Sequence, residues 1–149
     1  MGSMTWEGVG YFVRIIGNMD ANLYCKILND ELLETIKYYK LKQAEVILAQ
    51  DNDPKHKSII AQQTIADLGI NVFDWLSQSP DLNPIEHLWN HYHRKLKEES
   101  LFWSSPDELW DNLEILFQDP NKKLCRNLIA PMPKRIQAVI QAKGGHTKY

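Results

Sequence analysis

The order of strand-like and helix-like segments limits how this chain can fold. Segments rich in β-branched and aromatic residues predict strands at residues 9–16, 46–50 and 70–76. Apolar residues at helical spacing and cap residues predict helices at residues 22–41, with a bend near residues 29 and 30, at 58–67, from 86 onward and from 105 onward. Ser58 would cap the second of these helices and Gly69 would end it, and Ser105 with Pro106 would begin the last. This alternation is typical of an α/β fold, in which helices pack on the faces of a sheet.

Length and composition fit one soluble domain. The chain has 149 residues, of which 44% are hydrophobic, enough for a single core. No apolar run approaches the roughly 20 residues that span a bilayer, and the amino terminus lacks the pattern of a signal peptide. Cys25 and Cys125 have no neighbouring Cys, so we expect reduced, buried thiols. An intracellular protein without a membrane segment is predicted.

Charge is divided unevenly along the sequence. All 19 Asp and Glu residues precede residue 120, whereas seven of the 17 Lys and Arg residues follow it, so residues 120–149 carry +7. Pro131 and Pro133 divide this basic tail into two helical pieces. Such a tail can neutralise DNA phosphates in a salt-sensitive, sequence-independent way. The alternative is an amphipathic helix with solvated lysines that docks on an acidic body.

Two carboxylates occupy positions that suit metal binding. Asp51 ends the strand predicted at residues 46–50, and Glu86 opens a helix after a loop rich in Ser, Pro and Asn. Carboxylates on rigid elements can hold divalent metal for phosphoryl transfer. Each also has a structural explanation: Asp51 would satisfy the amides of a turn, and Glu86 would form a capping box with Asn83. Spacing alone leaves both explanations open.

The sequence around these carboxylates resembles mariner-type cut-and-paste transposases. The matching blocks are QDNDPKH at residues 50–56 and WLSQSPDLNPIEHLW at residues 75–89, and MPKRI at 132–136 and GGHTKY at 144–149 resemble the family's carboxyl-terminal end. The resemblance runs from about residue 6 to residue 149. It implies a ribonuclease H-like fold with added C-terminal helices, a function in DNA transposition and a nuclear location.

The resemblance also implies roles for particular residues. In the family, a first Asp and the residues matching Asp51 and Glu86 bind two Mg²⁺ or Mn²⁺ ions, which activate water or a DNA 3′ hydroxyl and stabilise the leaving oxygen. DNA is the implied partner, with no small-molecule substrate. The predicted DNA-binding residues are Lys55, His56, Lys122, Lys123, Arg126, Lys134 and Arg135. For Lys55 and His56, a solvated turn is an equal alternative.

The opening residues resemble the middle of the family's catalytic domain. The family's helix-turn-helix region and its first strand, which bears the first catalytic Asp, have no match within residues 1–149. We therefore expect a single, truncated ribonuclease H-like domain that lacks the central first strand, binds metal weakly and is inactive alone. Residues 1–3 fit either a cloning remnant or part of a strand.

Two other functions stay open. One is a non-catalytic DNA-binding or assembly module derived from a transposase, and the other is an active site completed by a second polypeptide. The missing strand would leave the edges of residues 9–16 and 46–50 unpaired, and unpaired buried amides cost about 1 to 3 kcal/mol each. We therefore expect either a homodimer through exposed strand edges or a smaller, rearranged sheet.

Overall fold

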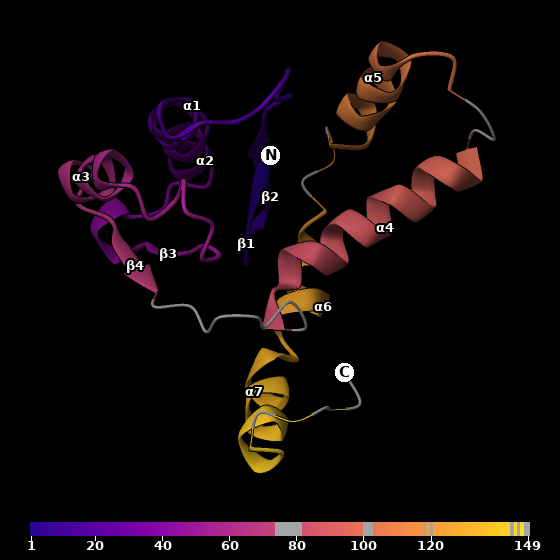
Figure 1. Ribbon diagram of the computed structural model, residues 1–149. Helices are drawn as coiled ribbons and strands as arrows, with labels where there is room; N and C mark the ends of the chain where they lie inside the picture. Colours follow the sequence, from indigo (N-terminus) through magenta and orange to yellow (C-terminus); the bar gives the residue numbers. More distant parts are fainter. Residues whose placement is uncertain are drawn as a thin grey trace. The chain divides into compact units, whose positions relative to one another are not determined.

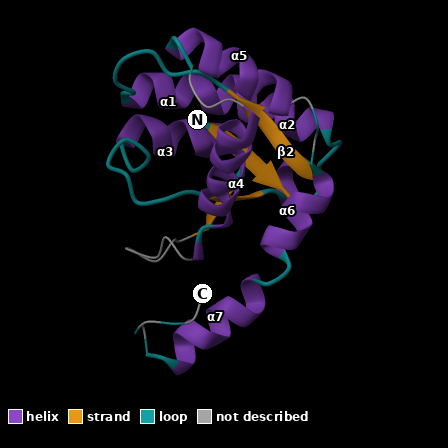
Figure 2. Ribbon diagram, turned by 90° about the vertical axis from the view of Figure 1, so that its right-hand side faces the viewer, coloured by secondary structure: helices purple, strands orange, loops and turns teal. Residues whose placement is uncertain are grey.

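The structure is a computed structural model that describes residues 1–73, 82–99, 103–117, 119, 121–143, 145 and 147 (Figure 1). Helices predominate over short strands (Figure 2). The chain divides into two compact units: unit 1 comprises residues 1–3 and 10–78, and unit 2 comprises residues 4–9 and 79–149. Each unit has its own hydrophobic core.

The chain begins with a hairpin of two short strands. β1 (Gly2–Thr5) and β2 (Gly8–Phe12) form a two-stranded sheet. The Thr5 hydroxyl fixes the turn, because its oxygen accepts hydrogen bonds from the Glu7 and Gly8 N–H groups at 3.1 and 3.2 Å. The strand predicted at residues 9–16 is thus observed as β2, which ends at Phe12 and has β1 as its neighbour.

A single helical stretch follows and contains one irregular turn. α1 (Ala21–Ile27) continues through a π-helical turn, η1 (Leu28–Leu32), into α2 (Leu33–Tyr38). Asp20 caps the start by accepting a hydrogen bond from the Leu23 N–H at 2.8 Å. The predicted helix and its expected irregularity near residues 29 and 30 are both confirmed, and the irregularity is the π turn.

A strand, helix and strand complete unit 1 as far as it is described. β3 (Ile47–Ala49) pairs in parallel with β4 (Asn71–Phe73), and a short 3₁₀ turn, η2 (Gln43–Glu45), precedes β3. α3 (Ile59–Asp67) connects the two strands. Among the described residues no third strand pairs with them. Residues 74–76 of the strand predicted at 70–76 lie outside the described part of the chain.

The predicted ends of α3 are confirmed. The Ser58 hydroxyl accepts a hydrogen bond from the Ala61 N–H at 3.3 Å, as a helix cap does. Gly69 stops the helix with a φ of +63°, a conformation that is strained for residues with a Cβ. The chain then turns directly into β4.

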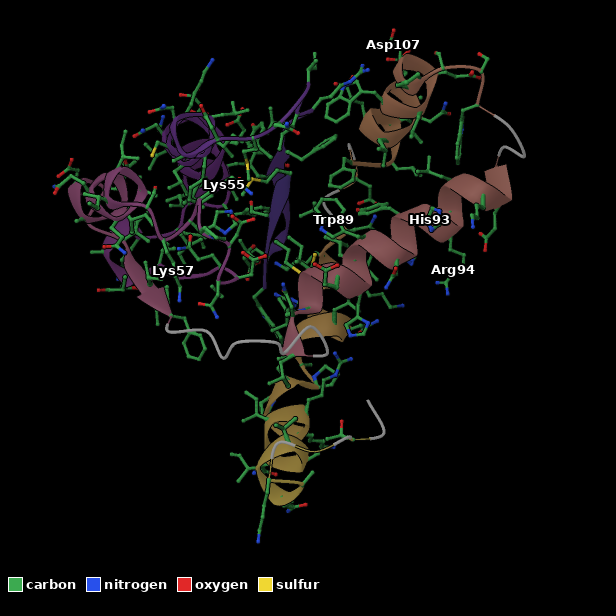
Figure 3. All side chains as sticks on the ribbon, viewed as in Figure 1. Lys55, Lys57, Trp89, His93, Arg94 and Asp107 are labelled. Carbon is green, nitrogen blue, oxygen red and sulfur yellow. The ribbon has the colours of Figure 1, made fainter. Side chains whose placement is uncertain are left out.

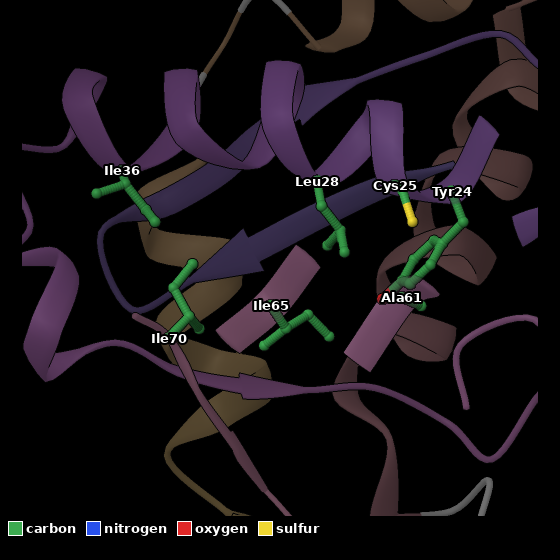
Figure 4. Packing of buried hydrophobic residues seen from close by; sticks show 7 residues of the cluster. All are labelled: Tyr24, Cys25, Leu28, Ile36, Ala61, Ile65 and Ile70. Atoms are coloured by element: carbon green, nitrogen blue, oxygen red, sulfur yellow. The ribbon is translucent and has the colours of Figure 1, made fainter. Parts of the chain in front are cut away.

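The core of unit 1 joins the helical stretch to α3. Figure 4 shows its buried side chains facing one another between these helices and the strands: Tyr24, Cys25, Leu28, Ile36, Ala61, Ile65 and Ile70. Burying one large aliphatic side chain contributes about 1.5 to 3 kcal/mol. This packing holds α1 and α3 together, and the loop that carries Asp51 leads from β3 into α3.

Unit 2 is helical apart from its hairpin residues. α4 (Pro84–Glu99) and α5 (Pro106–Phe117) are followed by α6 (Lys122–Ile129) and α7 (Met132–Gln141), which the predicted prolines separate. Val9, Leu88, Tyr92 and Cys125 form the core, and the Tyr92 ring stacks on Phe117 with ring centroids 4.4 Å apart. Within the described ranges, no helix has the length and hydropathy needed to cross a membrane.

Two further local predictions are confirmed. The Ser105 hydroxyl accepts a hydrogen bond from the Glu108 N–H at 3.2 Å, so the Ser-Pro start of α5 forms as expected. Cys25 and Cys125 are both buried, free thiols. Burial raises the pKa of the Cys125 thiol to about 11, which keeps it protonated and unreactive at neutral pH.

Candidate functional site

Asp51 lies directly after β3, in the loop that leads to α3. One carboxylate oxygen, Oδ1, accepts a hydrogen bond from the Asp53 N–H at 3.1 Å and lies 2.7 Å from His56 Nδ1. The other oxygen, Oδ2, has no hydrogen-bond partner among the described residues, and the side chain is 61% exposed. The turn explanation for Asp51 therefore accounts for one oxygen and leaves the second available to a ligand.

His56 is buried beneath this loop. Only 8% of the residue is exposed, and its ring packs against Tyr24 with centroids 4.2 Å apart. The Tyr24 hydroxyl donates a hydrogen bond to the Gln50 side-chain oxygen. Burial, with the nearby Asp51 carboxylate, raises the pKa of Tyr24, so this hydroxyl remains a donor. His56 thus has little surface to offer a phosphate, and its geometry favours a role in orienting Asp51.

Lys55, which is labelled in Figure 3, forms an ion pair with Asp53 in the same loop. Its ammonium lies 2.8 Å from Asp53 Oδ2, and its backbone N–H donates to Asp53 Oδ1 at 2.9 Å. These contacts from Lys55 hold the pKa of Asp53 below its usual value. Lys57 is exposed and forms no ion pair in the described structure. Sequence reasoning missed Lys57, although a lysine beside the Asp51 block was a visible signal.

Glu86 lies in the first turn of α4, and its side chain is exposed. The capping-box explanation is not realised, because Asn83 Oδ1 accepts a hydrogen bond from the Ile85 N–H at 3.3 Å and the Glu86 side chain bonds to no described residue. The backbone N–H of Glu86 donates to the Asn83 carbonyl at 3.2 Å. Both oxygens of Glu86 are therefore uncommitted within the part of the chain that is described.

The uncommitted oxygens suit a hard divalent cation in their chemistry. Mg²⁺ and Mn²⁺ take carboxylate oxygens as ligands and usually keep several waters. Asp51 belongs to unit 1 and Glu86 to unit 2. The described residues contain no group of three or more His, Cys, Asp or Glu side chains that could hold a metal ion. The structure does bring Asp51, Lys55 and His56 together in one loop.

Two cations of the basic tail are engaged by one carboxylate. Lys122 forms an ion pair with Glu7, and Arg126 lies 3.4 Å from the same carboxylate. The Arg126 guanidinium also lies over the Trp6 ring, 5.3 Å from its centroid. Lys122, and then Arg126, hold the pKa of Glu7 below its usual value. For α6, the alternative of a helix docked on an acidic residue therefore accounts for two of the predicted DNA contacts.

The remaining predicted cations differ in their surroundings. Lys123 and Lys134 are exposed and form no ion pair with a described residue. Arg135 is half-buried, and its Nε is buried. Lys148, Gly144 and His146 lie outside the described residues, as does the first part of the second matching block, residues 75–81. Lys123 and Lys134 are thus the predicted tail residues best placed to meet a phosphate.

The sequence and the fold both have known relatives. Residues 1–109 match the family described as DDE superfamily endonuclease. The chain is 36% identical over 148 residues to the transposable element Tcb1 transposase of Caenorhabditis briggsae, and 36% identical over 150 residues to the Tc1 transposase of Caenorhabditis elegans. Each alignment covers 99% of this chain and 53% of the relative. The chain therefore spans about half the length of the curated relatives it matches.

Solved structures with the same fold include the Mos1 transposase catalytic domain with Raltegravir and Mg. That match has a TM-score of 0.84 at 23% identity and covers 96% of this chain and 73% of that one. A pre-cleavage Mos1 transpososome matches with a TM-score of 0.84 at 22% identity, over 97% of this chain and 44% of the other. The predicted α/β class is confirmed, and the match supports a ribonuclease H-like fold.

Proposed function

The chain belongs to the DDE superfamily endonuclease family, and we propose that it is the catalytic-domain part of a cut-and-paste DNA transposase. Its reaction would be DNA strand cleavage and joining by two-metal phosphoryl transfer. The observation that carries the proposal is that the family match over residues 1–109 contains two carboxylates, Asp51 and Glu86, whose uncommitted oxygens no fold contact explains.

Asp51 and Glu86 would hold Mg²⁺ or Mn²⁺. The bound ions would neutralise phosphate charge and lower the pKa of an attacking water or hydroxyl. Asp51 would bind through Oδ2, because its Oδ1 is engaged by the loop, whereas both oxygens of Glu86 are available. The similar Mos1 catalytic domain has been solved with Mg and with Mn, which supports this choice of metal.

DNA would be the macromolecular partner, and the nucleus the place of action. Structures of the similar Mos1 transposase include paired-end complexes. In this chain Lys57, Lys123 and Lys134 would contact phosphate, since they are exposed and form no ion pair with a described residue. Lys122 and Arg126 would contribute only if they exchange Glu7 for DNA.

A homodimer through strand edges remains a prediction. Among the described residues no further strand pairs with the outer edges of β3 and β4, and unpaired strand edges can pair with a second chain. The apolar side chains of Ile47, Val72 and Phe73 on this pair are also exposed. Sedimentation velocity across a range of concentrations would test this. A monomer at every concentration would exclude the homodimer.

The 149-residue polypeptide alone should show no nicking or strand transfer with Mg²⁺ or Mn²⁺. Two carboxylates clamp a metal pair less firmly than the three of the family. The test compares this polypeptide with a chimera in which the preceding part of the Tcb1 transposase is fused to its start. We expect metal-dependent nicking by the chimera, and its loss in Asp51→Asn and Glu86→Gln.

The matched control is Glu98→Gln, which also removes an exposed carboxylate from α4. It should leave nicking unchanged. The second candidate function, a non-catalytic DNA-binding or assembly module, is favoured by Lys123 and Lys134, exposed cations of the basic tail that form no ion pair with a described residue. A chimera that binds DNA but does not nick it would support that module, and nicking by the 149-residue polypeptide itself would refute the predicted inactivity.

A further inference from the structure

The buried His56 ring touches Asp51, and the proposed reaction gives it no role. We propose that His56 is a positioning residue, which holds Oδ1 of Asp51 so that Oδ2 is the oxygen presented to a divalent cation. This inference rests on the proposed function, because it assumes that Asp51 is a metal ligand. It adds that the buried His56 side chain is what fixes this choice of oxygen.

The hydrogen-bonding chemistry of the pair assigns the proton. An ionised carboxylate only accepts hydrogen bonds, so His56 Nδ1 must donate across the 2.7 Å to Asp51 Oδ1. Nε2 is buried and has no partner among the described residues, so it is an unsatisfied donor if it carries a proton and an unsatisfied acceptor if it does not. The hydrogen bond to Asp51 therefore carries the assignment of a proton to Nδ1. The buried ring limits the access of water to this hydrogen bond on the side of His56, whereas the Asp51 side chain is 61% exposed.

Neighbouring contacts keep the ring in this place. Tyr24, which is only 1% exposed, packs against one face of the ring. The same Tyr24 donates its hydroxyl hydrogen to Gln50, so α1 contacts the residues on both sides of the Asp51 loop. Within the loop, the His56 N–H donates to the Asp53 carbonyl at 2.9 Å. The imidazole cannot turn away from Asp51 without breaking this packing.

A second hydrogen bond to Asp51 Oδ1 supports the conclusion that Oδ2 is the oxygen left for a metal ion. The Asp53 N–H donates to the same oxygen at 3.1 Å, so two donors meet at Oδ1 and none of the described donors meets Oδ2. A carboxylate held in this way offers a single oxygen in a fixed direction. Partners that orient a metal ligand typically change metal affinity by about 10- to 100-fold when they are removed.

Two substitutions separate positioning from simple packing. His56→Phe keeps an aromatic ring against Tyr24 and removes the donor to Asp51. His56→Asn loses the ring but keeps an amide N–H near the place of Nδ1–H. A purely structural histidine predicts that Phe is tolerated and Asn is harmful. If His56 positions Asp51, metal binding should be weakened in His56→Phe and largely kept in His56→Asn. This order should hold whichever of the two variants is the more stable.

The measurement uses Mn²⁺ alone, added to the ¹⁵N-labelled 149-residue chain, and follows paramagnetic broadening of the Asn52 and Asp53 amide signals. His56→Phe should weaken Mn²⁺ binding about 10-fold, while thermal melting shows a folded protein. His56→Asn should stay within a few-fold of the wild type despite a lower melting temperature. Equal binding by His56→Phe and wild type, or equal losses in the two variants, would overturn the proposal.

A further measurement needs no variant. Two-bond ¹H–¹⁵N NMR spectra of the wild-type chain identify which ring nitrogen of His56 carries the proton. We expect Nδ1, and a proton on Nε2 would overturn the proposal even if both variants failed to fold. The Asp51→Asn variant distinguishes failure of the proposed function from failure of this inference. If Mn²⁺ still broadens the signals in Asp51→Asn, Asp51 is not a ligand. If broadening is lost in Asp51→Asn but Mn²⁺ binding is unchanged in His56→Phe, only the role of His56 is refuted.

Discussion

The Asp51 loop and the start of α4 present the same chemical group in different ways. Asp51 is held through its side chain, by a backbone N–H and by a buried histidine. Glu86 is held only through its backbone, at the end of a helix whose opposite side is anchored by Leu88 and Tyr92. The Asp51 carboxylate therefore points in a fixed direction. The backbone of Glu86 is fixed, but its side chain is free to rotate.

This difference indicates how each position responds to change. Substitutions around Asp51 should change the position of its Oδ2 oxygen, because the neighbouring residues contact the carboxylate itself. Substitutions around Glu86 should act through the packing of α4. Four predictions follow this contrast, first in the stability of both units and then in the charges of unit 2.

The largest effect on stability is expected in the first turns of α4. Leu88 is fully buried, so Leu88→Ala should cost about 2 to 5 kcal/mol of unfolding free energy through lost contacts and a cavity. Glu86→Gln, two residues away and exposed, should change it by less than about 0.5 kcal/mol. Urea denaturation of both variants measures the difference. A small loss in Leu88→Ala would show that packing of α4 does not place Glu86.

A smaller effect is expected at the helix caps. Ser58→Ala and Ser105→Ala each remove a hydroxyl that caps a helix, and each should cost about 1 kcal/mol. The Ser58 hydroxyl also donates to the Lys55 carbonyl at 2.9 Å, inside the Asp51 loop. Amide hydrogen exchange at His56 should therefore accelerate in Ser58→Ala and stay unchanged in Ser105→Ala. Equal exchange in the two variants would break the proposed link between cap and loop.

In unit 2, one substitution should increase DNA binding, because it releases two cations from an ion pair. Glu7→Gln removes the partner of Lys122 and Arg126, so affinity for duplex DNA should rise several-fold. The slope of log affinity against log salt should steepen by about 0.9 for each cation that reaches a phosphate. Lys134→Gln, which removes an exposed cation, should flatten it by about the same amount. Fluorescence anisotropy at several salt concentrations gives both slopes. If Glu7→Gln binds DNA like the wild type, Lys122 and Arg126 have a purely structural role.

The smallest expected effect is on acid stability. The pKa of Glu7 is lowered in the folded protein by Lys122 and Arg126, so its contribution is present above the unfolded pKa and is lost as pH falls through the folded value. Below its ordinary value of 4.5, wild type should therefore lose more stability than Glu7→Gln. The difference should shrink in 1 M salt, because the pair is exposed. Thermal melts at stepped pH would show it, and parallel curves for the two proteins would contradict it.

Local signals predicted much of the fold. The cap at Ser58, the stop at Gly69 and the Ser-Pro start of α5 follow from short-range chemistry, and each is confirmed. β1 was expected only as one of two explanations for residues 1–3, because Gly2 and Ser3 carry no strand signal of their own. The pairing of β1 with β2 depends on a turn fixed by the Thr5 hydroxyl.

The site was predictable only in part, for a physical reason. Asp51 and Glu86 lie at the ends of predicted elements, but the resemblance of the sequence blocks around them is what singled them out. The sequence around His56 reads as a solvated turn, and its burial depends on Tyr24, which lies far upstream. The engagement of Lys122 and Arg126 likewise depends on Glu7, near the other end of the chain. Charge composition counts such cations but does not show which are already paired.

The π turn at Leu28–Leu32 has a consequence for insertions and deletions. An α-helix advances about 100° per residue, so eight residues from Leu28 to Ile36 would leave Ile36 about 80° out of phase. A π turn absorbs one extra residue and returns Ile36 to the buried face. Deleting the exposed Asp30 should therefore convert the turn into regular helix and keep every later side chain on its face. The same deletion within α3 would rotate the rest of that helix out of the core.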